Sequence, residues 1–108
     1  MKLKKPVDLT IRIPGDKELL SLVMDASENL AAKIGFDDNK VRNIRTAVGE
    51  SCANAIEHCN KNDPDKEIFL VFHVEETKLE INIFSSIITH HSVNFRVKSL
   101  ISASWDKL

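Results

Sequence analysis

The chain has 108 residues, 43% of them hydrophobic, and its 15 basic and 16 acidic side chains give a net charge of −1. This length suits one small domain with a single core, and the balanced charge argues against a nucleic acid or an anionic membrane as partner. No apolar run approaches the roughly 18–20 residues that span a bilayer, and no apolar signal core follows the basic N-terminus. We therefore expect a cytoplasmic protein that makes no membrane contact.

The first half of the chain predicts one strand and two helices. Apolar and polar residues alternate over 7–13, which is typical of a strand buried on one face. Pro14 and Gly15 end this strand, and Asp16 is suited to cap a helix whose apolar residues recur at helical spacing up to Gly35. Asp37 or Asp38 caps a second helix. Its expected apolar stripe consists of Val41, Ile44, Val48, Cys52, Ala55 and Cys59.

The second half predicts two further strands after a polar loop over residues 60–65. Residues 68–74 are apolar at nearly every position, which favours a strand covered on both faces. Residues 79–83 alternate and follow after a short connection, so the two strands are expected to form an antiparallel hairpin. The order strand, helix, helix, strand, strand predicts an α+β two-layer sandwich. Its sheet is antiparallel or mixed, with both helices on one face.

The last residues, 85–108, have two interpretations. Val93, Phe95 and Val97 alternate as in a strand, whereas Val97, Leu100, Ile101 and Ser104 fit a short helix. We treat this segment as a divergent tail that follows a domain over residues 1–84. A sheet that ends at residue 84 leaves an unpaired edge, and the apolar tail exceeds what three strands and two helices cover. Both features predict a homodimer, with exchange of tails as its route.

A polar row on the second helix is the main candidate site. Glu50, Asn54 and His58 are spaced four residues apart, and about 100° per residue places them on one slowly drifting face. A carboxylate and an amide one turn apart can hold a divalent metal and orient a water. The alternative is a solvated face, since polar residues opposite an apolar stripe need no function.

The cysteines and the remaining histidines do not form an evident metal site. Cys52 and Cys59 lie seven residues apart on the same predicted helix, about 10 Å by rise alone, which is too far for a disulfide. We expect both to be reduced. His90 and His91 are adjacent, and neighbours on a strand point to opposite faces.

The segment over residues 44–58 resembles the N-box helix of the GHKL (Bergerat-type) ATPases. It is most similar to the anti-sigma-factor serine kinase branch, whose N-box reads roughly A-V-x-E-A-x-x-N-A-x-x-H. The resemblance covers about residues 7–84 and implies a partial Bergerat fold with ATP and Mg²⁺ as cofactors. It also implies that Glu50 is the general base or positions the acceptor hydroxyl, that Asn54 coordinates Mg²⁺, and that His58 lies near the nucleotide.

The same resemblance implies a sigma factor and an anti-sigma-factor antagonist as partners, the antagonist being phosphorylated on serine. It further implies an Asp-x-Gly-x-Gly box after the strand at 79–83, with the Asp reading adenine. The chain instead continues Phe84-Ser85-Ser86-Ile87-Ile88-Thr89 and has no glycine after Gly49. We therefore expect a degenerate, truncated or frame-shifted member with weak or absent ATP binding. The alternative function is a non-catalytic, dimerising protein-interaction module without nucleotide.

Overall fold

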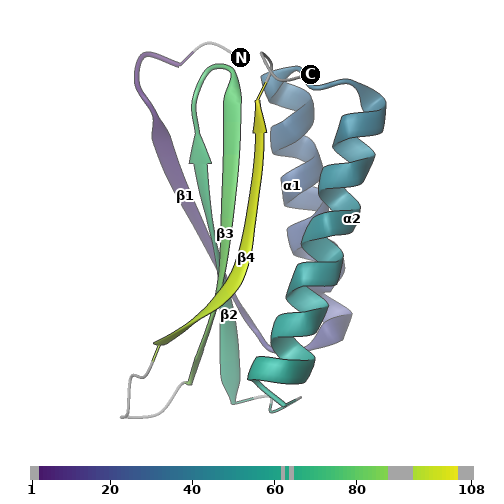
Figure 1. Ribbon diagram of the computed structural model, residues 1–108, viewed down its shortest axis with the longest axis vertical. Helices are drawn as coiled ribbons and strands as arrows, with labels where there is room; N and C mark the ends of the chain where they lie inside the picture. Colours follow the sequence, from purple (N-terminus) through teal and green to yellow (C-terminus); the bar gives the residue numbers. More distant parts are fainter. Residues whose placement is uncertain (1–2, 62, 64, 88–93, 105–108) are drawn as a thin grey trace.

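The computed structural model describes residues 3–61, 63, 65–87 and 94–104, and within them the chain forms a helical layer on a four-stranded sheet (Figure 1). The N-terminal half folds as one strand, a short 3₁₀ turn and two helices that end in a π turn. The elements in chain order are β1 Val7–Pro14, η1 Lys17–Leu19, α1 Leu20–Ile34, α2 Asp38–Asn54, η2 Ala55–Cys59, β2 Lys66–Val74, β3 Lys78–Ile87 and β4 Asn94–Ser104.

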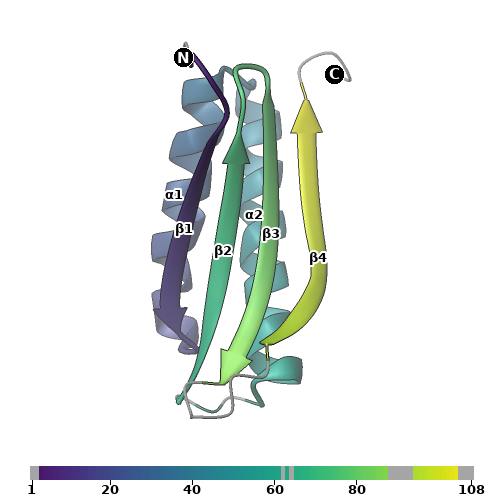
Figure 2. The ribbon, with the colours of Figure 1, turned by 90° about the vertical axis from the view of Figure 1, so that its left-hand side faces the viewer.

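The strands are ordered β1-β2-β3-β4, and every neighbouring pair is antiparallel. Phe72 in β2 lies opposite Leu9 in β1 and Ile81 in β3, which fixes the register across the first three strands. Figure 2 views the sheet face-on, with both helices behind it. The predicted α+β two-layer sandwich is confirmed, and its sheet is antiparallel rather than mixed in the described part of the chain.

The capping residues predicted from the sequence lie at boundaries of the helical elements, with Asp16 before the 3₁₀ turn η1 that leads into α1. The Asp16 carboxylate accepts a hydrogen bond from the Glu18 amide at 2.9 Å, and Asp37, rather than Asp38, accepts one from the Lys40 amide at 2.8 Å. α1 ends at Gly35, whose φ of 110° is the left-handed conformation that glycine adopts at no steric cost. The predicted capping residues therefore make the local interactions expected of them.

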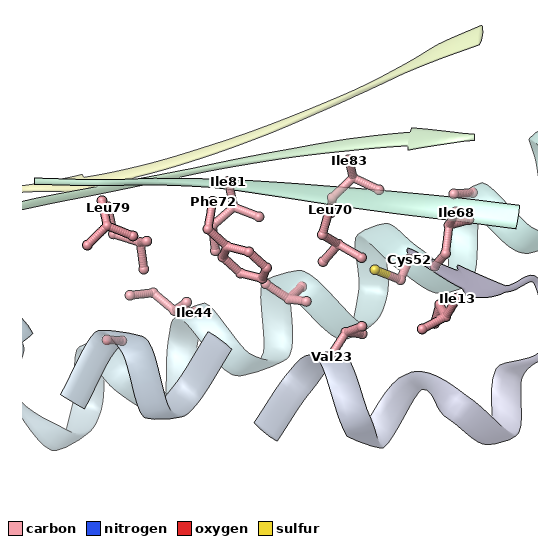
Figure 3. Close-up of a cluster of buried hydrophobic side chains, with 14 of the residues drawn as sticks. Ile13, Val23, Ile44, Cys52, Ile68, Leu70, Phe72, Leu79, Ile81 and Ile83 are labelled. Atoms are coloured by element: carbon pink, nitrogen blue, oxygen red, sulfur yellow. The ribbon is translucent and has the colours of Figure 1, made fainter. Parts of the chain in front are cut away.

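The core lies between the helices and one face of the sheet. β2 and β3 contribute alternate residues to it, and the helices contribute one apolar stripe each (Figure 3). Its most deeply buried side chains include Phe72, Leu70, Ile68, Ile81, Val23, Val48 and Cys52. Two close contacts hold the helices together, since Met24 of α1 packs on Gly49 of α2, and Arg45 of α2 lies 2.9 Å from Glu28 of α1.

The prediction that β2 is covered on both faces is wrong. Its residues alternate between buried and half-buried, and Phe69 and Val71 belong to the half-buried set on the face away from the helices. No element within the described ranges packs over that face. Phe69 is instead flanked in its own sheet by Arg12 of β1 and Phe84 of β3. Such cross-strand neighbours shield an apolar side chain without a second layer, and for this reason an unbroken apolar run does not require one.

The segment beyond residue 84 continues the sheet. β3 runs on to Ile87, and β4 pairs along it with an irregularity at Ile83 and Phe84. The strand interpretation of residues 94–104 is therefore correct and the helical one is wrong. The edge of β3 that we expected to be unpaired is covered by β4, because the tail returns beside it. His90, His91, Val93 and Trp105 lie outside the described residues, and the division of the chain at residue 84 stays a prediction.

Candidate functional site

The three residues of the polar row lie on one helical segment and are all exposed. Glu50 and Asn54 belong to the C-terminal end of α2, and His58 belongs to the π turn η2 that follows directly. The His58 side chain is 75% exposed. Val48 and Cys52, which interleave with the row, are fully buried. The structure therefore confirms that the row is opposite the apolar stripe, and it leaves the three side chains accessible to a ligand.

A π turn at the end of α2 was not foreseen from the sequence. The amide of Asn60 donates to the carbonyl of Ala55 at 2.9 Å, which is a hydrogen bond over five residues instead of four. In this turn Ile56 and Asn60 lie in the interior, where each is only 1% exposed. The Asn60 amide nitrogen lies 3.4 Å from the carbonyl of Glu67 in β2. The sequence predicts an apolar stripe that ends at Cys59. The side chain of Cys59 lies outside the described residues, so this last position of the stripe stays a prediction.

The π turn also changes the direction of the polar row. In an α-helix each four-residue step overshoots a full turn, so the row would drift by about 40° from Asn54 to His58. A π turn advances less per residue, which reduces that drift. His58 is thereby kept closer to the direction shared by Glu50 and Asn54. π turns of this kind occur frequently at functional sites, which is consistent with a ligand site at this end of the helix.

An ion pair beside the row joins two segments that are distant in the sequence. Lys17, at the start of η1, donates to the carboxylate of Glu57 in the π turn. This hydrogen bond is the main cause that holds the pKa of Glu57 below its usual value. Sequence reasoning missed the contact because the two residues are 40 positions apart and neither belongs to a motif. The pair fixes a positive and a negative charge next to His58.

The position of the missing box is occupied by regular β-structure. Ser85 of β3 pairs with Ile68 of β2 on one side and with Phe95 of β4 on the other. Ser85 is only 1% exposed. β3 continues through Ser86 to Ile87, so the backbone makes no turn where Asp-x-Gly-x-Gly would follow the strand. A strand with neighbours on both sides has no free backbone groups for a ligand there. The structure thus offers no adenine-reading carboxylate at this position.

The donor chemistry of the row suits magnesium only in part. The Asn54 amide oxygen and the Glu50 carboxylate are the hard oxygen ligands that Mg²⁺ prefers, usually together with phosphate and water. Among the described residues, no group of three or more His, Cys, Asp or Glu side chains is arranged to hold a metal alone. The residues of the row therefore fit the magnesium end of a nucleotide site. The residues at the box position do not fit its adenine end.

Comparisons with known proteins give the family of this chain. The model of the histidine kinase-like ATPase domain matches residues 13–93. The chain belongs to this family. That match includes the whole polar row and the strand in which the box is absent. It supports the assignment to the GHKL anti-sigma-factor kinase branch, because the similar curated proteins are kinases of that branch.

Three of these relatives are named serine-protein kinase RsbW. The protein of Listeria innocua is 29% identical over 75 residues, which cover 69% of this chain and 48% of the relative. The protein of Bacillus subtilis is 26% identical over 73 residues, which cover 68% of this chain and 46% of the relative. The protein of Bacillus cereus is 27% identical over 90 residues, which cover 83% of this chain and 56% of the relative. The chain thus spans about half the length of the curated relatives it matches. Within its described residues, no helix is long and apolar enough to cross a membrane.

Proposed function

We propose that this chain is an anti-sigma-factor domain of the histidine kinase-like ATPase family in which nucleotide binding is weak or lost. Its partners in this proposal are a sigma factor and an anti-sigma-factor antagonist, by similarity to proteins named serine-protein kinase RsbW. A cytoplasmic location belongs to the same proposal, because a domain acting on a sigma factor works where transcription takes place. The observation that carries it is the exposed N-box row beside a β3 strand that runs straight through the box position.

Within this proposal the residues of the row keep the roles that the family implies. Asn54 is the magnesium ligand, His58 lies near the nucleotide, and Glu50 is the general base or positions the acceptor hydroxyl. Magnesium, when bound, neutralises phosphate charge, and the protein mainly positions groups around it. The exposure of all three side chains supports these roles. The absence of a turn and a carboxylate at Ser85 argues that the adenine end contributes little binding energy.

Titration calorimetry with ATP and Mg²⁺ tests the proposal. We expect no heat of binding in the micromolar range for the wild-type chain. Micromolar binding that Asn54→Ala abolishes would contradict the proposed loss of nucleotide binding. Asn39→Ala is the matched control, because Asn39 is also an exposed asparagine of α2 but lies near its other end. A signal lost equally in both variants would report a change in the helix rather than in the site.

A second candidate function is a dimerising interaction module that uses no nucleotide. The observation that favours it is the edge of β1, which no strand of the described chain covers. A homodimer is part of this proposal, whether or not the tails are exchanged. Light scattering over a dilution series tests it, because a chain that stays monomeric at the highest concentration has no such function. Sigma-factor binding by a nucleotide-free protein would favour the first candidate instead.

A further inference from the structure

Lys17 brings a positive charge from a distant segment of the chain to the polar row. It is the first residue of η1, and its side chain is 47% exposed. Its ammonium group donates a hydrogen bond to Oε1 of Glu57. The other oxygen of the same carboxylate, Oε2, lies 3.9 Å from Nε2 of His58. A single carboxylate therefore separates the Lys17 ammonium from the imidazole of the row.

The backbone holds Lys17 at this place independently of the ion pair. Gly15, two residues earlier, donates its amide to the Lys66 carbonyl at 2.8 Å. A Cβ on Gly15 would lie 3.1 Å from the side-chain nitrogen of Asn60, so the corner before η1 packs directly on the end of the π turn. Figure 1 shows the start of α1 and the end of α2 at the same end of the helical layer. Lys17 would thus stay beside the row if its bond to Glu57 were broken.

The charges next to the row are poorly suited to a polyanion without Lys17. Glu50 and Glu57 each carry a negative charge, and Asn54 is neutral. A magnesium-bound triphosphate keeps a net negative charge, because its oxygens carry more charge than one divalent ion neutralises. Lysine is a common phosphate ligand, which acts as a point charge with three donors. Lys17 supplies such a cation at the place where the phosphates would meet the row.

The described residues at the other end of the site offer no comparable contact to a base. Ser85, at the position of the absent box, is 1% exposed and is paired on both sides within the sheet. Discrimination between bases requires polar groups that bond to the base edge. Binding energy in this site is then concentrated in the contacts that Asn54, His58 and Lys17 make to phosphate groups and their magnesium ion.

We propose that the row and Lys17 bind a magnesium-bound polyphosphate chain without reading a base. The ligand class is a triphosphate, either as part of a nucleoside triphosphate or as inorganic tripolyphosphate. Lys17 contacts the phosphate oxygens, and Glu57 holds its ammonium beside the row when no ligand is bound. This inference rests on the proposed function, because it assumes the magnesium end of the site and the loss of the adenine end.

Glu57 opposes the ligand that Lys17 attracts. The hydrogen bond with Lys17 is the main cause that lowers the pKa of Glu57, so its carboxylate is ionised at neutral pH. A phosphate group next to it meets a like charge and competes with it for the ammonium. Loss of Lys17 and loss of Glu57 break the same ion pair, yet they should change polyphosphate binding in opposite directions. This difference separates a contact to the ligand from a purely structural role.

Chemical-shift titrations with tripolyphosphate and Mg²⁺, followed at the side-chain signals of Asn54 and His58, test the role of Lys17. Lys17→Met should weaken binding about fivefold, and Lys17→Arg should keep it, because a guanidinium also binds phosphate. Glu57→Gln should strengthen binding about threefold. Lys5→Met is the control for net charge, since Lys5 is exposed and precedes β1 at the end of the sheet opposite η2. Weaker binding in both Lys17→Met and Glu57→Gln, or a change in neither, would overturn the contact between Lys17 and phosphate.

A comparison of ligands tests whether the site reads a base. ATP, GTP and tripolyphosphate, each with Mg²⁺, should bind wild type with dissociation constants that agree within about threefold. Nuclear magnetic resonance is suited to this comparison because it detects binding too weak for calorimetry. A preference above about tenfold for both nucleotides over tripolyphosphate would overturn the polyphosphate ligand, because the sugar would then be read.

The remaining outcomes separate this inference from the proposed function. A preference above about tenfold for ATP alone would refute both, because the adenine end would then be intact. Equal binding of the three ligands that Lys17→Met leaves unchanged would keep the proposed function and refute the contact to Lys17. No shift of the Asn54 and His58 signals with any ligand up to about 10 mM would refute this inference and leave the proposed loss of nucleotide binding standing.

Discussion

The carboxylate of Asp8 lies 2.5 Å from Nδ1 of His73 and connects β1 to β2 on the face away from the helices. The Glu75 carboxylate lies 3.5 Å from the other ring nitrogen, and Glu80 of β3 is the cross-strand neighbour of His73. The hydrogen bond with Asp8 is the main cause that raises the pKa of His73. A histidine in this setting keeps its proton to a higher pH than a free imidazole does.

The first prediction concerns the pH dependence of stability. Because the folded protein raises the pKa of His73, its contribution to stability is fully present below the pKa of the unfolded chain. It is lost as the pH rises through the higher pKa of the folded state. The melting temperature of wild type should therefore fall more between pH 6 and 8 than that of His73→Gln. Parallel melting curves for the two proteins over this range would contradict the prediction.

The second prediction concerns the thiol of Cys52. This side chain is fully buried, and burial raises its pKa to about 12. Since the thiolate is the reactive form, native Cys52 should react with iodoacetamide at pH 8 roughly a thousandfold more slowly than an ordinary thiol. Cys59→Ser isolates the measurement, because the chain has two cysteines. We expect Cys52 to react rapidly with iodoacetamide only in urea. An equal rate of reaction in native buffer would contradict the burial of Cys52.

The third prediction compares two glycines. A Cβ on Gly15 would lie 2.9 Å from the backbone oxygen of Lys66, which cannot move without disturbing β2. Gly15→Ala should therefore lower the free energy of unfolding by about 1–3 kcal/mol. A Cβ on Gly49 would lie 2.8 Å from the end of the Met24 side chain, which can shift by rotation about its own bonds. Gly49→Ala should stay within about 1 kcal/mol of wild type, because better helix propensity offsets that contact. Urea unfolding of both variants measures the difference, and the reverse order would refute the argument.

The fourth prediction concerns the core side chain of the π turn. Ile56 in η2 is 1% exposed, so Ile56→Ala should cost about 2–5 kcal/mol of the free energy of unfolding. Ile56→Val removes less volume and should cost about 0.5–1.5 kcal/mol. Chemical denaturation gives both values. A cost near zero for Ile56→Ala would contradict the burial of this side chain.

Local signals in the sequence determined most of the fold. The alternation in β1, the caps at Asp16 and Asp37 and the glycine at position 35 predicted the elements that the structure contains. They succeeded because capping and periodicity act between residues a few positions apart. The Glu50, Asn54 and His58 row was also visible from spacing alone. The family it indicated is the one that the match over residues 13–93 gives.

Tertiary structure decided what depends on residues distant in the chain. It brought Lys17 to Glu57, turned Asn60 inward through the π turn, and paired the tail with β3 as β4. None of these contacts has a local signature, because each exists only after strands and helices from both halves have packed. Only the sheet order placed β1 at an edge, because that position depends on the pairing of β2 with both β1 and β3.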